Sequence, residues 1–152
     1  MSGRIIVVTI FVLALATAAL AADNPFVGTW KLNVERSSKA ANSPKSDTYK
    51  SEAIENGLKI TRDAVNADGT TVHTEQVVVF DGKDHPYEVF PPATAAVCSL
   101  IGDSNYACLL KRDGQEMLKI YDVVSGNGRT QTLIFASRQT RDFVVAYVYE
   151  KQ

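Results

Sequence analysis

The chain has 152 residues, with 16 Lys and Arg against 17 Asp and Glu and a formal net charge of −1. Hydrophobic residues make up 45% of the chain, which is enough for one core at this length. Disorder is excluded, because disordered chains are poor in apolar residues or strongly charged. The balanced charge, without a basic stripe, also excludes a nucleic-acid-binding surface.

The N-terminal segment, residues 1–22, has the three parts of a secretory signal peptide. A short basic start is followed by an apolar run over residues 5–20 and then by small residues that end in Ala21 and Ala22. We predict that this segment is cleaved after Ala21 or Ala22 and that residues 23–152 form an exported domain, periplasmic or secreted, without stable membrane insertion. The alternative is an uncleaved anchor, because the run is about as long as the shortest transmembrane helices.

Two cysteines, Cys98 and Cys108, lie in the exported part of the chain, where disulfides persist. The residues between them are turn formers, and a hairpin centred on Asp103 sets the two cysteines opposite each other, within reach of an S–S bond. We therefore predict a structural disulfide. The alternative, a redox-active pair, is disfavoured because the spacing is not that of a Cys-x-x-Cys motif.

Turn sequences recur along the exported part and separate short segments that are rich in β-branched and aromatic residues. The turns are Asn56-Gly57, Asp68-Gly69, Asp81-Gly82, Asp113-Gly114 and Gly126-Asn127-Gly128. The spacing predicts strands over 26–34, 47–55, 58–64, 70–80, 86–90, 95–101, 105–112, 115–124, 129–137 and 142–150. The polar segment 35–46, with Pro44, predicts a loop in which one helical turn is possible.

The alternation of apolar and polar residues along the strands predicts which faces of the sheet are buried. In 115–124, one face carries Met117, Lys119, Tyr121 and Val123, and the other carries Leu118, Ile120, Asp122 and Val124. Neither face is cleanly polar, whereas a sheet covered on one side alternates more strictly. We predict an all-β fold, an antiparallel up-and-down barrel of 8–10 strands whose closure removes both sheet edges.

The segment Asn24-Pro25-Phe26-Val27-Gly28-Thr29-Trp30 carries a family resemblance. Gly28-x-Trp30 at the head of the first strand resembles the signature of the calycins, which include lipocalins, fatty-acid-binding proteins and avidins. The resemblance implies that Trp30 seals one end of a barrel and that a basic residue, Arg138 or Arg141, packs over it in a cation–π contact.

More narrowly, residues 24–33, 81–86 and 148–151 resemble small exported bacterial lipocalin-like proteins of unknown function. The chain lacks a later Thr-Asp-Tyr motif, so the ligand and receptor roles of true lipocalins do not carry over. Residues 35–46 are too short and too polar for the two-helix lid of fatty-acid-binding proteins.

The two histidines, His73 and His85, are candidate functional groups. His73 and Glu75 share one face of a predicted strand, but two ligands are too few for a metal site. His85 follows Asp84, but adjacent residues in a turn seldom orient each other, and no nucleophile is placed nearby. We predict no metal, no cofactor and no catalytic residue.

The strand aromatics line either a ligand pocket or a filled core. For the pocket we choose Tyr121, Phe135 and Tyr147. The predicted function is binding of a small, largely apolar molecule without catalysis. The alternatives are a filled-barrel interaction or inhibitor module that uses loop 34–47 and Pro91-Pro92, and an enzyme on the same scaffold. No protein partner follows from the sequence.

Overall fold

The computed structural model describes residues 24–137 and 144–152. They form ten antiparallel strands. The strands are β1 (Gly28–Leu32), β2 (Ser46–Ile54), β3 (Gly57–Val65), β4 (Thr71–Val79), β5 (Asp84–Pro86), β6 (Ala95–Gly102), β7 (Asn105–Arg112), β8 (Gln115–Val124), β9 (Thr130–Ser137) and β10 (Val144–Lys151). The predicted fold class is thereby confirmed. In the described part of the chain, no helix has the length and apolar character of a membrane span.

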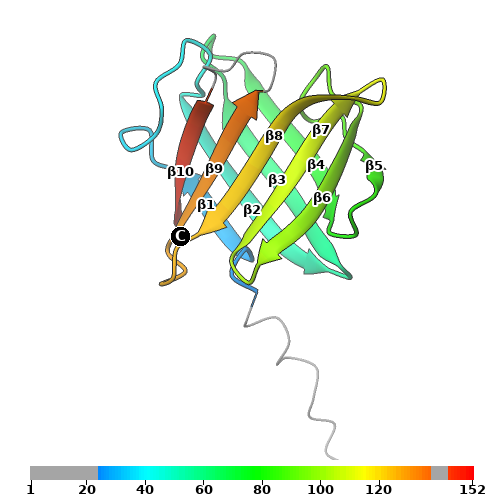
Figure 1. Cartoon of the computed structure of the whole chain (residues 1–152). Helices are drawn as coiled ribbons and strands as arrows, with labels where there is room; N and C mark the ends of the chain where they lie inside the picture. Colours follow the sequence, from blue (N-terminus) through cyan, green and yellow to red (C-terminus); the bar gives the residue numbers. More distant parts are fainter. Residues whose placement is uncertain (1–23, 138–143) are drawn as a thin grey trace, which may run out of the picture.

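The strands make one sheet in the order β4-β3-β2-β1-β10-β9-β8-β7-β6-β5, which curls into a barrel (Figure 1). Each strand pairs with its neighbour in sequence except β4 with β5, and β1 pairs with β10. Trp30 on β1 stands opposite Lys151, the residue before the C-terminal Gln152, and so lies near the end of the barrel where the chain leaves. The turn between β3 and β4, the 33–45 segment and the 87–94 segment lie at the opposite end, called here the loop end.

The barrel is nearly closed. The prediction that closure removes both sheet edges is wrong, because β4 and β5 remain as the two edges of the sheet. β4 approaches β6, but no ladder joins β4 to β5. This unpaired gap between β4 and β5, called here the seam, arises because β5 is short. This strand was predicted over 86–90 and instead ends at Pro86, because residues 87–94 form a wide turn in which Pro91 and Pro92 have no N–H to donate.

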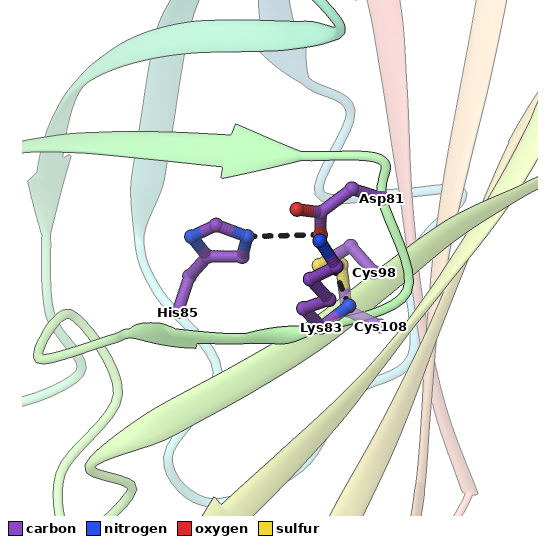
Figure 2. The surroundings of a disulfide bond; sticks show 5 residues. All are labelled: Asp81, Lys83, His85, Cys98 and Cys108. Carbon is purple, nitrogen blue, oxygen red and sulfur yellow. Dashed lines mark hydrogen bonds and ion pairs between the residues drawn. A yellow bond between two sulfur atoms is a disulfide. The ribbon is translucent and has the colours of Figure 1, made fainter.

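The predicted disulfide is confirmed, with Cys98 directly opposite Cys108 across β6 and β7 and Cα atoms 4.1 Å apart (Figure 2). The turn itself has two residues, Asp103 and Ser104. An even loop alone would place Cys98 out of register with Cys108. The register shift beside Ile101 supplies the extra residue that brings them opposite each other.

Trp30 is fully buried, and its indole N–H donates to the Phe26 carbonyl at 3.0 Å. Lys151 on β10 covers it, with Nζ 5.2 Å from the ring centroid. The arginines predicted for this position, Arg138 and Arg141, lie outside the described residues.

Gly28 makes room for that lysine. Its φ is +143°, which L side chains rarely adopt, and a Cβ there would lie 2.6 Å from Lys151 Cε. The spacing of Gly28 and Trp30 therefore has a local physical reason: the glycine lets the cation reach the ring that it covers.

The 33–45 segment takes the place of β1 as the hydrogen-bonding neighbour of the half of β10 that lies toward the loop end. Asn33 N–H donates to Val148 O at 2.8 Å, and Ser38 N–H donates to Ala146 O at 2.8 Å. The Ser37 and Ser38 hydroxyls accept from the N–H groups of Val148 and Ala146, each at 2.9 Å. Two serine side chains therefore satisfy a strand edge that β1 is too short to reach.

Candidate functional site

The barrel interior holds a cavity of about 470 Å³ that reaches the loop end. That volume lies within the range of small-molecule sites. Its lining is mostly apolar and aromatic, with a few polar groups. The lining residues are Asn42, Pro44, Asp47, Tyr49, Ile60, Arg62, Asn66, Val72, Gln76, Val78, Tyr87, Val89, Phe90, Pro91, Tyr106, Cys108, Ile120, Asp122, Leu133, Phe135, Val145, Tyr147 and Tyr149.

Side chains alternate between the two faces of a strand, and this alternation places some polar side chains inside the barrel. On β8 the residues Leu118, Ile120 and Val124 are buried in the core. Asp122 shares their face, so its carboxylate points inward with them. Because its apolar neighbours on this face are buried, Asp122 is buried as well, and its carboxylate needs hydrogen-bond partners there.

Asp47 on β2 is 2% exposed and accepts two hydrogen bonds through one oxygen. Arg62 Nε donates to Oδ2 at 2.8 Å, and the Tyr149 hydroxyl donates to it at 2.9 Å. Arg62 Nη2 also lies 2.7 Å from Oδ2, which makes the contact an ion pair. Burial alone would lower the pKa of Arg62, but the bond and charge of Asp47 outweigh burial and raise it. The other Asp47 oxygen, Oδ1, is buried without a partner among the described residues.

Asp122 is 1% exposed and accepts a hydrogen bond from Gln131 Nε2 through Oδ2. The Tyr106 hydroxyl also interacts with this carboxylate. Desolvation raises the pKa of Asp122 to about 7 and outweighs the opposing effects of Gln131 and Tyr106. Its Oδ1 is likewise buried without a partner in the described chain.

The two carboxylates belong to one polar cluster. Tyr149, which binds Asp47, stands directly opposite Gln131, which binds Asp122. Tyr49 is close enough that both acids raise the pKa of its hydroxyl, after the larger effect of its own burial. Burial also raises the pKa of Tyr106 and Tyr149, so all three tyrosines stay protonated at neutral pH.

Aromatic side chains lie on the loop-end side of this cluster. Phe135 contacts Tyr147 edge to face, with centroids 5.7 Å apart, and stacks with Phe90 at 6.1 Å. The Tyr147 hydroxyl lies 3.3 Å from Ser43 Oγ in the 33–45 segment. The lining is therefore divided into a polar part near the middle of the barrel and an apolar part near the loops.

Of the three aromatics that the sequence singled out, the structure brings Phe135 and Tyr147 together in the cavity lining. Tyr121 is on the opposite face of β8 from Asp122, half-buried and outside the lining. The difference arises because Leu118, Ile120 and Val124 turn their own face of β8 inward.

The histidines lie apart from the cavity. His73 Nδ1 contacts Asp63 at 2.7 Å on exposed positions. His85 Nε2 contacts Asp81 at 2.9 Å beside the disulfide (Figure 2), whereas its neighbour Asp84 pairs with Lys111. Among residues 24–137 and 144–152, no three His, Cys, Asp or Glu side chains are arranged to hold a metal ion.

Sequence reasoning missed the buried acids Asp47 and Asp122 and the half-buried Arg62. The alternation of β8 placed Asp122 beside Leu118 and Ile120, and that pattern was a usable signal. Nothing local distinguishes Asp47 or Arg62 from surface residues of an exposed strand, because their pairing depends on the register of β2 with β3.

Comparisons with known proteins identify the fold. No family model and no curated protein matches the sequence. Solved structures share its architecture, among them the following two. A Schistosoma mansoni fatty acid binding protein in complex with arachidonic acid aligns with a TM-score of 0.63 at 11% identity, over 86% of this chain and 98% of that one. A secretary abundant heat soluble protein from Ramazzottius varieornatus aligns with a TM-score of 0.59 at 9% identity, over 85% and 96%. At such identities the likeness shows the fold alone, an antiparallel β-barrel.

Proposed function

We propose that this protein binds a small, largely apolar molecule inside its barrel, without catalysis and outside the cytoplasm. The observation that carries the proposal is the cavity of about 470 Å³, lined by aromatic and aliphatic side chains with a few convergent polar groups. A barrel of similar fold is a fatty acid binding protein that holds arachidonic acid.

Two further observations support the location and the chemistry. The Cys98–Cys108 disulfide fits an oxidising compartment. The described lining contains no histidine, and its one cysteine, Cys108, is bonded, so neither a Ser–His nor a Cys–His pair is among these residues. The filled-barrel interaction module is disfavoured, because a filled barrel leaves no room of this size.

Native mass spectrometry of the protein recovered from its producing cells, before and after organic extraction, tests this function. A defined adduct that extraction removes is the expected result, and it supplies the ligand's mass. A clean apo mass, together with no binding of any apolar probe, would favour the filled-barrel alternative.

Replacing Tyr147 by alanine should weaken ligand binding without unfolding the protein, because the side chain lines the cavity near the loop end. Tyr121→Ala is the matched control: it removes the same side chain from the outer face of β8. Binding of the extracted ligand, measured by titration calorimetry, should fall in the first variant only. Equal binding by both variants, or unfolding of Tyr147→Ala alone, would contradict the assignment.

A further inference from the structure

The cavity has an excess of buried negative groups. Among its described lining residues three can carry charge, namely Asp47, Arg62 and Asp122. The single cation is already committed, because Arg62 donates a hydrogen bond to Asp47 Oδ2 and forms an ion pair with it. Among residues 24–137 and 144–152, Asp122 has no cationic partner: its bound oxygen accepts from the neutral amide of Gln131.

Free acceptors in the lining need donors. Asp47 Oδ1 and Asp122 Oδ1 are buried with no partner in the described chain, and so is the Gln76 side-chain oxygen. The Tyr49 hydroxyl, close to both acids, is also unpartnered. A buried acceptor without a donor is costly, and a ligand group that donates to it recovers that cost.

The unpartnered acceptors in the described lining suit a ligand whose polar end donates hydrogen bonds and carries a positive charge. A protonated amine donates up to three hydrogen bonds and supplies the missing positive charge. A carboxylate would donate nothing, would face two acids, and would compete with Asp47 for Arg62. We propose that the cavity selects amphiphiles with a protonated amine head group, held by Asp47 and Asp122 with the apolar part toward Phe135 and Tyr147, and that it discriminates against fatty-acid carboxylates.

This inference rests on the proposed binding function and deepens it. Its test compares three probes of equal chain length, decylamine, decanol and decanoate, by titration calorimetry at neutral pH below their micellar concentrations. Decanol reports whether the cavity takes an alkyl chain at all. Decylamine should bind about ten-fold or more tightly than decanoate, because a buried charge pair outweighs a repelled one by at least that factor.

Two variants separate the charge argument from general apolar binding. Asp122→Asn should lower decylamine affinity about ten-fold and leave decanol unchanged. Asp47→Asn releases Arg62, so decanoate should gain affinity. Asp113→Asn, the same change on an outer turn with the side chain 83% exposed, is the control and should bind as the wild type does.

The outcomes are distinguishable. Decanol binding with decanoate equal to or tighter than decylamine would overturn the head-group inference and leave the binding function standing. No binding of any of the three probes would overturn both. The wild-type comparison decides the matter even where Asp47→Asn fails to fold, since the preference is measured on the unaltered protein.

Discussion

Replacing Asp122 by asparagine should make the protein more stable above neutral pH and change little under acidic conditions. In the folded barrel, burial raises the pKa of this carboxyl from 3.8 to about 7. Between those values the folded state holds a proton that the unfolded state has released. Stability must therefore fall as the pH rises through this interval. An asparagine keeps the shape, has no proton to lose, and can still accept the bond from Gln131.

The size of the effect follows from the same values. One pKa unit corresponds to about 1.4 kcal/mol, so the rise to about 7 costs the folded state about 4 kcal/mol once the pH exceeds both values. This is a large share of the roughly 5–15 kcal/mol by which domains are stable. The penalty is nearly absent below about pH 4 and complete by about pH 8.

Urea unfolding across this pH range, followed by Trp30, the chain's one tryptophan, measures the effect. Other ionisable groups contribute equally to wild type and variant, so the informative quantity is the difference between the two proteins, in which those contributions cancel. Asp113→Asn, on an exposed turn, is the matched control. A difference in free energy of unfolding that does not change with pH would refute the reasoning, and so would one that favours the wild type above neutral pH.

Three further predictions concern the scaffold. Reduction of the Cys98–Cys108 disulfide, or its replacement by a pair of alanines, should cost about 2–3 kcal/mol for so small a loop, as a lower urea midpoint; an unchanged midpoint would contradict it. Lys151→Met should remove the contact over Trp30 and lower stability by about 0.5–2 kcal/mol, together with a change in near-ultraviolet circular dichroism that Lys31→Met should not produce. Gly28→Ala should destabilise by about 1–3 kcal/mol through its positive φ and the crowding of Lys151, and thermal melting no lower than that of the wild type would exclude that strain.

Much of the fold was predictable because the signals are local. Pairs such as Asp113-Gly114 adopt the positive φ that tight hairpins require, with values of 50° and 77°, and they fix where strands end. The disulfide followed from spacing and turn chemistry alone. The seam beside β5 did not, because it depends on whether a short segment interrupted by Pro91 and Pro92 can reach a strand far away in the chain.

The candidate site was harder to predict, because its polar part is assembled from strands that lie far apart in the sequence. Asp47 and Arg62 meet through the register of β2 with β3, and Gln131 reaches Asp122 across β9 and β8. The aromatic residues Phe135 and Tyr147 were found because large side chains in a barrel point inward or outward by simple alternation. Tyr121 shows the weakness of that rule when both faces of a strand are apolar.

The seam between β4 and β5 also bears on self-association. β4 ends the sheet with a backbone edge to which another chain could add a strand. Its outward side chains include His73, paired with Asp63, and Glu75, paired with Lys59. Charges set along a free edge oppose its docking onto a second sheet. His73 and Glu75 therefore make this edge less suited to pairing with a second chain.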